Sequence, residues 1–101
     1  MQEVTVDQVG NDGALVLDVR EGVEYVEAHV PGAVLIPMGQ VPARIAEIDP
    51  ARTIHVICRS GNRSRTITEL LLARGFDAFN VIGGTMAWVQ SGRPVNTGTL
   101  P

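Results

Sequence analysis

The sequence predicts an α/β fold with a mainly parallel central sheet of about five strands and helices on both faces. Short apolar runs that end at turn residues alternate with segments of helical periodicity along most of the chain. This alternation is typical of parallel sheets, because the crossover between two parallel strands usually contains a helix. The 101 residues suit one domain, with a core expected over residues 4–94 and a loose tail at 95–101.

Three strands and two helices are expected in the first half of the chain. The expected strands are Val4-Thr5-Val6, Leu15-Val16-Leu17 and Val34-Leu35-Ile36, and the expected helices are Glu21–Ala28 and Pro42–Ile48. The first strand is weak, whereas the other two are continuous apolar runs, which indicates strands buried on both faces. Pro31-Gly32 ends the first helix, and Pro42 fits the first turn of the second, where its missing N–H would have no partner.

Two more strands and two more helices are expected in the second half. The expected strands are Ile54–Ile57 and Phe79–Ile82, and the expected helices are Arg63–Arg74 and Thr85–Gln90. In the longer helix Ile67, Leu70 and Leu71 fall at positions i, i+3 and i+4, so they share one apolar face. Gly75 suits the left-handed conformation that often follows the end of a helix.

The composition excludes several classes of protein. The net charge is −3 and all eight basic residues are arginine, so the chain lacks the basic face of a nucleic-acid-binding protein. One cysteine excludes an internal disulfide, a dithiol redox motif and a cysteine-rich metal site. The first residues lack the pattern of a signal peptide, and no apolar run approaches the ~20 residues of a membrane helix. We therefore expect a cytoplasmic protein with no membrane partner.

The lone cysteine follows a strand at the edge where this fold class places its ligands. Cys58 comes directly after the strand at 54–57, and Asp18 ends an earlier strand. Gly83-Gly84 forms a turn after the last strand, and Thr85 is expected to cap the helix that follows. Because ligands of open parallel sheets bind beyond the carboxyl ends of the strands, these residues mark the candidate site.

The segment Cys58-Arg59-Ser60-Gly61-Asn62-Arg63-Ser64 runs from a strand through a turn into a helix. Gly61 and Asn62 let the backbone curl tightly, so several N–H groups can point into one concave site. The helix N-terminus and the charges of Arg59 and Arg63, with Arg65 as a candidate third, add positive potential. Such settings lower the pKa of a cysteine from about 8.5 to roughly 3.5–7.5 and make the thiolate a nucleophile beside an anion pocket.

Two other interpretations of Cys58 follow from the residues alone. A lone cysteine is often an inert core residue, although a structural cysteine gains nothing from neighbouring arginines and a glycine turn. Cysteine phosphatases separate the thiolate and an arginine by five residues. Here Ser64 holds that position, with Arg63 one residue early and Arg65 one late. A phosphatase or arsenate reductase is weakened as an interpretation but stays open.

Four segments, in this order and at these spacings, resemble the motifs of single-domain members of the rhodanese family over roughly Val4 to Pro94. They are Asp18-Val19-Arg20 with Glu24-Tyr25, His29 to Ala33 with Ile36-Pro37, Cys58 to Ser64, and Gly83-Gly84 with Ala87-Trp88, Gly92 and Pro94. Two residues depart from the family pattern, Ala28 where glycine is common and Leu35 where asparagine is frequent. Both lie away from the cysteine loop.

The resemblance implies a single rhodanese-like domain over residues 1–101 that acts as a thiosulfate sulfurtransferase. Cys58 would accept the outer sulfur of a small anionic donor as a persulfide and pass it to cyanide, a thiol or an acceptor protein. No metal or organic cofactor is implied. The six-residue loop is the length that this family uses for sulfur, and its cationic charge favours thiosulfate. The implied binding residues are Arg59, Ser60, Gly61, Asn62, Arg63 and Ser64, supported by Asp18 and Arg20.

A non-catalytic persulfide carrier, or an interaction module in sulfur trafficking, is compatible with the same loop. Both functions need only one cysteine, so the sequence leaves them open. For the residues singled out beyond the loop, a structural or solvent-facing role is the preferred interpretation. We expect a structural Asp18–Arg20 pair, a hydrogen-bonded His29, a core Trp88 and a solvated face formed by Glu21, Glu24 and Glu27.

Overall fold

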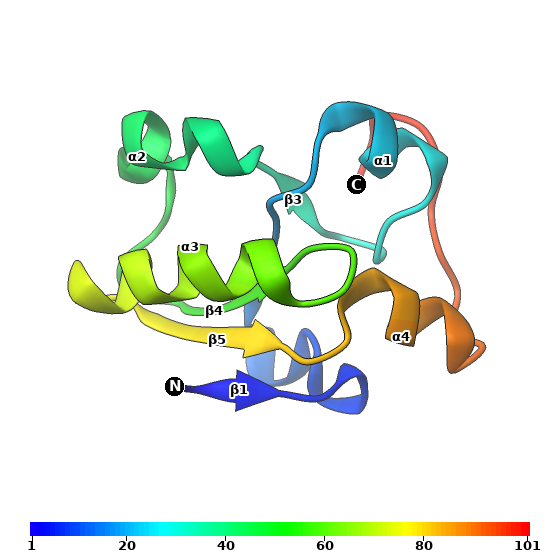
Figure 1. Cartoon of the computed structure of the whole chain (residues 1–101), viewed down its shortest axis with the longest axis horizontal. Helices are drawn as coiled ribbons and strands as arrows, with labels where there is room; N and C mark the ends of the chain where they lie inside the picture. The colour runs from blue at the N-terminus through cyan, green and yellow to red at the C-terminus, as the bar shows by residue number, and fades with distance from the viewer.

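The computed structural model describes residues 1–101 and has a five-stranded sheet in the order β1-β5-β4-β2-β3, with every pair parallel (Figure 1). The strands are β1 (Glu3–Val4), β2 (Leu15–Asp18), β3 (Val34–Leu35), β4 (Thr53–Ile57) and β5 (Asp77–Val81). The α-helices are α1 (Gly22–Glu27), α2 (Val41–Arg44), α3 (Asn62–Ala73) and α4 (Gly84–Gln90). Four 3₁₀ helices complete the fold: η1 (Val6–Gln8), η2 (Asn11–Gly13), η3 (Met38–Gln40) and η4 (Ile45–Glu47). The predicted α/β class is confirmed.

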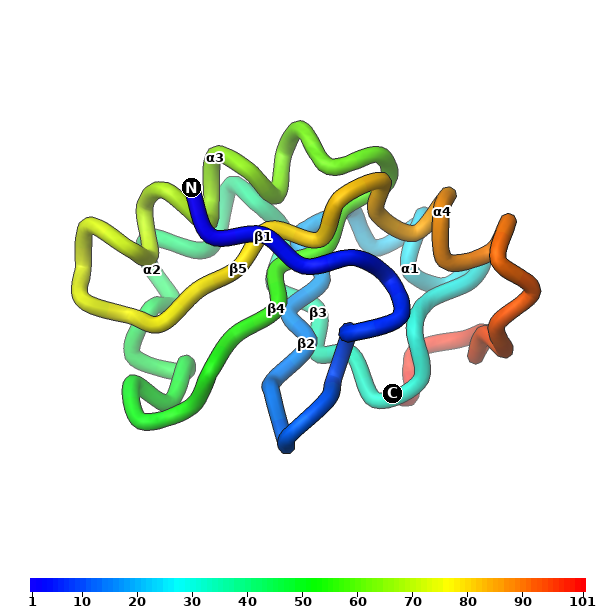
Figure 2. The backbone as a smooth tube through the Cα atoms, turned by 90° about the horizontal axis from the view of Figure 1, so that it is seen from below, coloured from blue at the N-terminus to red at the C-terminus, as the bar shows by residue number.

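Two apolar clusters fill the two sides of the sheet, because successive side chains of a strand point to opposite faces. Val56 packs in the cluster that includes Ile67 and Leu71 of α3, whereas Ile57 packs with Tyr25 of α1 and Trp88 of α4. Figure 2 shows α2 and α3 on one side of the strands, and α1 and α4 together toward one end. Helices therefore cover both faces, as predicted. No helix has the length and apolar character needed to cross a membrane.

The strand register gathers the predicted site residues at one edge of the sheet. Asp18 lies opposite Ile57, the last residue of β4, and Val56 lies opposite Asn80 of β5. Cys58, the first residue after β4, therefore lies between the ends of β2 and β5. The turn at Gly83 follows β5 at the same edge, which is the arrangement expected from parallel strands.

Two local expectations are wrong. Val34 is exposed, so the run at 34–36 is not a strand buried on both faces; β3 lies at the edge of the sheet and pairs only with β2. Gly83, not Thr85, stands at the N-cap of α4, with a φ of 77° that an L side chain rarely adopts. Thr85 lies inside the helix, where its hydroxyl donates a hydrogen bond to the carbonyl of Cys58. The expected glycine after the long helix is present, since Gly75 has a φ of 87°.

The segment expected to be a loose tail is bound to the domain. His29 and Asn96 exchange two backbone hydrogen bonds of 2.9 Å, and the N–H of Gly98 donates to the carbonyl of Val26. The fully buried His29 ring has its nitrogens 2.8 Å from the carbonyl of Tyr25 and 2.9 Å from that of Leu100. Figure 1 shows this last segment running beside α1. His29 is a hydrogen-bonded structural residue, as expected, but its partners include the tail.

Removing residues 97–101 should destabilise the domain by about 1–3 kcal/mol, because a ring nitrogen of the buried His29 would lose its carbonyl partners. Urea unfolding of the truncated and full chains measures the difference. Thr97→Ala is the control, because this exposed side chain makes no hydrogen bond, and it should leave the stability unchanged. Equal stability of the truncated and full chains would show that the tail is loose.

Candidate active site

Cys58 is both a core residue and the centre of a hydrogen-bonded loop. Its side chain is 1% exposed and packs in the apolar cluster on the α3 side of the sheet. The sulfur nevertheless accepts a hydrogen bond from the N–H of Gly61 at 3.1 Å and lies 3.2 Å from the hydroxyl of Ser64. An inert core cysteine would lack such polar neighbours. The surroundings are those of a sulfur prepared to carry negative charge.

The first turn of α4 holds the carbonyl groups of the cysteine loop. The carbonyl of Cys58 accepts from the N–H of Thr85 at 2.8 Å and from its hydroxyl at 3.1 Å, and the carbonyl of Arg59 accepts from the N–H of Met86 at 3.0 Å. In a trans peptide the C=O and N–H groups point in opposite directions. Turning these two carbonyls toward α4 therefore turns the N–H groups of Arg59 and Ser60 away from α4, and the N–H of Ser60 donates to the sulfur.

Gly84 makes this contact between the loop and α4 possible. A Cβ atom at this position would lie 2.5 Å from the carbonyl oxygen of Cys58 and 2.6 Å from that of Arg59. Both distances are far below a van der Waals contact. The resemblance to the family places the Gly83-Gly84 turn beside the cysteine loop, and the structure shows that α4 needs a residue without a side chain there.

Burial and hydrogen bonding act in opposite directions on the Cys58 thiol. Burial raises its pKa, but the Ser64 hydroxyl and the N–H groups of Ser64, Gly61 and Ser60 outweigh burial and leave the pKa below its ordinary value. The sequence assigned this effect to the loop N–H groups, the helix N-terminus and arginine charge together. In the structure, the main cause of the lowered pKa is a set of four hydrogen bonds to the sulfur, three of which come from backbone N–H groups.

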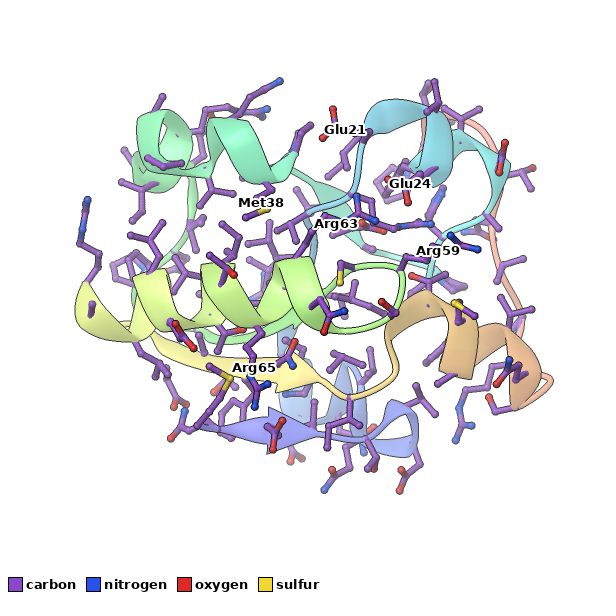
Figure 3. All side chains as sticks on the ribbon, viewed as in Figure 1. Glu21, Glu24, Met38, Arg59, Arg63 and Arg65 are labelled. Carbon is purple, nitrogen blue, oxygen red and sulfur yellow. The ribbon has the colours of Figure 1, made fainter.

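Arg63 forms an ion pair instead of standing free beside the thiol. Its guanidinium contacts both carboxylate oxygens of Glu24 on α1, at 2.7 and 2.9 Å (Figure 3). This ion pair lowers the pKa of Glu24 to about 2. The hydrogen bond to Glu24 is also the largest cause that raises the pKa of Arg63, and a Cys58 thiolate adds to it. Attraction is mutual, so Arg63 favours the thiolate, but Glu24 offsets much of its charge.

Three of the glutamate and arginine expectations need correction or refinement. Glu24 belongs to the site and not to a solvated face, because it binds Arg63. Figure 3 shows Arg65 on the opposite side of α3 from Arg63, so it adds no third charge to the loop. Arg59 is exposed and makes no ion pair within the chain, so its charge is available to a ligand.

A pocket of about 460 Å³ opens beside the cysteine loop, between α1 and α4. Arg59 supplies a free positive charge, and Met86 and Val89 of α4 supply apolar surface. The carboxylates of Glu24, which is paired with Arg63, and of Glu27 line the α1 side. Ser60 and Asn62 of the loop are exposed, whereas Gly61 and Ser64 are buried beneath it. The six predicted binding residues therefore differ in exposure. The exposed ones can contact a ligand from solvent, and the buried ones can act only on the sulfur.

Asp18 and Arg20 form the expected structural pair. Nε and Nη2 of Arg20 donate to both carboxylate oxygens of Asp18, and Nη2 also donates to the carbonyl of Ala28 at 2.7 Å. Both side chains are buried. The pair ties the end of β2 to the end of α1, which holds Glu24 in place, and makes no direct contact with the sulfur.

Asn80 is a site residue that the sequence did not indicate. This buried residue of β5 donates from Nδ2 to the carbonyl of Gly61 at 3.2 Å and accepts from the Ser64 hydroxyl at 2.6 Å. One amide thus joins the turn of the cysteine loop to the start of α3. The only signal in the sequence is an asparagine inside the otherwise apolar run Phe79–Ile82.

Glu24→Gln should lower the stability at neutral pH by about 1 kcal/mol, the scale of a partly exposed ion pair. The Glu24 carboxyl has a pKa of about 2 when folded, against 4.5 as its reference value. Its contribution is therefore present above pH 4.5 and is lost as the pH falls toward 2. Urea unfolding of both proteins across this range should show the difference shrinking. Glu27→Gln, on the same helix but without an ion pair, should show no such trend, and a pH-independent effect of Glu24→Gln would contradict the account.

Comparison with known proteins identifies the family. Residues 2–91 match the Rhodanese-like domain. YtwF of Bacillus subtilis, named as a candidate sulfurtransferase, is 41% identical over 80 residues, covering 79% of this chain and 78% of that protein. YrkF of the same organism, named as a candidate sulfur carrier protein, is 40% identical over 88 residues, or 85% of this chain and 48% of that protein. The thiosulfate sulfurtransferase GlpE of Actinobacillus pleuropneumoniae is 32% identical over 90 residues, covering 88% of this chain and 83% of that protein.

Solved structures agree with the sequence relatives. A rhodanese-related protein from Thermoplasma volcanium has a TM-score of 0.91 at 26% identity, covering 95% of this chain and 98% of that chain. A rhodanese-like domain protein from Staphylococcus aureus has a TM-score of 0.86 at 30% identity, covering 98% of this chain and 100% of that chain. The chain therefore belongs to the rhodanese-like sulfurtransferase family.

Proposed function

We propose that the protein is a thiosulfate sulfurtransferase that carries sulfur as a persulfide on Cys58. The observation that supports this most strongly is the set of hydrogen-bond donors around the sulfur, from Gly61, Ser64 and Ser60. These donors favour a thiolate, and they would also stabilise the negative charge of a persulfide. The name of GlpE, a thiosulfate sulfurtransferase, supports the choice of donor.

The first half-reaction transfers the outer sulfur of thiosulfate. The Cys58 thiolate attacks that sulfur and forms a new S–S bond, while the bond between the two thiosulfate sulfurs breaks. Sulfite leaves with the electron pair of the broken bond, and the enzyme retains the persulfide. Arg59, which lines the pocket and has no ion-pair partner, is placed to attract the dianionic donor and the departing sulfite.

The second half-reaction returns the thiolate. A nucleophilic acceptor, such as cyanide, a thiol or the thiol of an acceptor protein, attacks the terminal sulfur of the persulfide. The S–S bond breaks, its electrons return to Cys58, and the product is thiocyanate or a new persulfide. Neither half-reaction needs a metal or an organic cofactor. Within this proposal, Arg59, Ser60 and Asn62 meet the donor, and Gly61 and Ser64 act on the sulfur, with Arg63 held by Glu24.

The size and charge of the loop support sulfur over phosphate. The loop from Cys58 to Arg63 has no arginine at the position that cysteine phosphatases use, and its Arg63 is already bound to Glu24. A phosphoryl group would therefore find one free guanidinium, that of Arg59. The mild acidity of the chain supports a small anion or a protein, and not nucleic acid, as the partner, and we place the reaction in the cytoplasm.

A persulfide carrier is the second candidate function, and one observation favours it. YrkF, a relative that is 40% identical over 88 residues, is named as a candidate sulfur carrier protein. A carrier would gain sulfur from a donor protein yet turn over negligibly with thiosulfate and cyanide.

Intact mass spectrometry after incubation with thiosulfate tests the proposal. The protein should gain the mass of one sulfur atom, cyanide should remove it, and thiocyanate should be released at steady state. Cys58→Ser should abolish all three results. Thr97→Ala, an exposed residue that does not line the pocket, is the folding control. Sulfur uptake without turnover would favour the carrier. Hydrolysis of an aryl phosphate that depends on Cys58, without sulfur uptake, would contradict the proposal.

A further inference from the structure

The sulfur of Cys58 lies in a closed ring of hydrogen-bonding groups. Its Sγ is 3.2 Å from Oγ of Ser64, which is 2.6 Å from Oδ1 of Asn80. Nδ2 of Asn80 is 3.2 Å from the carbonyl of Gly61, and the N–H of Gly61 returns to the sulfur at 3.1 Å. All four residues are buried. Water therefore cannot replace a missing partner without opening the loop.

The orientation of the Asn80 amide is fixed by its partners. The carbonyl of Gly61 can only accept, so the amide nitrogen must face it. The amide oxygen then faces Ser64, and it too can only accept. The Ser64 hydroxyl must therefore donate its proton to Asn80, over a distance of 2.6 Å.

A hydroxyl has one proton, so Ser64 cannot donate to Asn80 and to the sulfur at once. In the thiol form the ring is complete: the S–H of Cys58 donates to Oγ of Ser64, and Ser64 donates to Asn80. In the thiolate form the S–H proton has gone to water. The hydroxyl lowers the pKa of Cys58 only when it rotates to the sulfur. That rotation leaves the buried Oδ1 of Asn80 without a donor.

We propose that Asn80 is a positioning residue that competes with Cys58 for the single proton of Ser64 and so restrains ionisation of the nucleophile. The backbone N–H groups of the loop favour the thiolate. Asn80 disfavours it, because it accepts the Ser64 proton that could otherwise be donated to the sulfur. The balance has a chemical use, because a thiolate that forms too easily is a weaker nucleophile. This proposal assumes the persulfide chemistry proposed above, but its test measures ionisation of Cys58 alone.

The charged groups near the ring are distinct from this competition. Arg59 belongs to the loop, Arg63 of α3 is paired with Glu24 of α1, and Asp18 at the end of β2 is paired with Arg20. Neither α4 nor the part of β5 beside the ring carries a charge, since the one charged residue of β5 is Asp77 at its start. A substitution of Asn80 leaves all of these charges in place.

A double-mutant cycle separates the proton competition from a merely structural role. Thiolate absorbance in the ultraviolet is followed against pH in the unmodified protein, Asn80→Leu, Ser64→Ala and the double variant; Cys58 is the only cysteine in each. Asn80→Leu should lower the midpoint by about half to one pH unit, because Ser64 then donates only to the sulfur. In the Ser64→Ala background the same substitution should not lower it. Thr68→Val, which removes a buried hydrogen bond to the backbone of Ser64, is the matched control.

An equal shift in both backgrounds, or no shift in either, would overturn the proposal, because Asn80 would then act only by holding the loop. A second measurement uses the unmodified chain and does not depend on the folding of a variant. The NMR signals of the Asn80 side-chain amide should move with the same midpoint as the Cβ of Cys58. Amide signals that stay constant through the Cys58 titration would equally overturn it.

Discussion

The carbonyl groups of Cys58 and Arg59 bind the first turn of α4, and the chemistry of the loop depends on this contact. Each carbonyl that points to α4 turns the N–H group of the same peptide away from α4. One of these groups, the N–H of Ser60, is a donor to the sulfur in a place where burial would otherwise keep the thiol neutral. The contact in turn depends on Gly84, where any side chain would collide with the two carbonyl oxygens.

The parallel sheet supplies the frame that brings these pieces together. The pairing of β4 with β5 places Asn80 beside the strand that carries Cys58, and the pairing of β2 with β4 places Asp18 at the same edge. Arg20 ties that edge to α1, and Glu24 of α1 then holds Arg63. The site thus uses side chains from several separate segments, while three of the four hydrogen bonds to the sulfur come from the backbone.

Much of this arrangement could be predicted from local patterns. The apolar runs located β2 and β4, the periodicity from Ile67 to Leu71 located α3, and the strand-turn-helix pattern located Cys58. What the sequence could not indicate are contacts between distant residues. Glu24 and Arg63 are 39 positions apart. Glu24-Tyr25 is part of a segment that resembles a family motif, but the residues around Glu24 do not show that its partner is Arg63. The same limit explains the tail, whose partner His29 lies far earlier in the chain, and the exposed Val34, whose burial depends on which strands flank β3.

Hydrogen bonds within the loop overcome burial and make Cys58 a thiolate more readily than an ordinary cysteine. A pH titration of thiolate absorbance in the unmodified protein tests this most directly, because the chain has one cysteine. We expect a midpoint below the ordinary value of about 8.5 for a free thiol. A midpoint at or above that value would show that burial dominates and that the loop does not prepare the sulfur for attack.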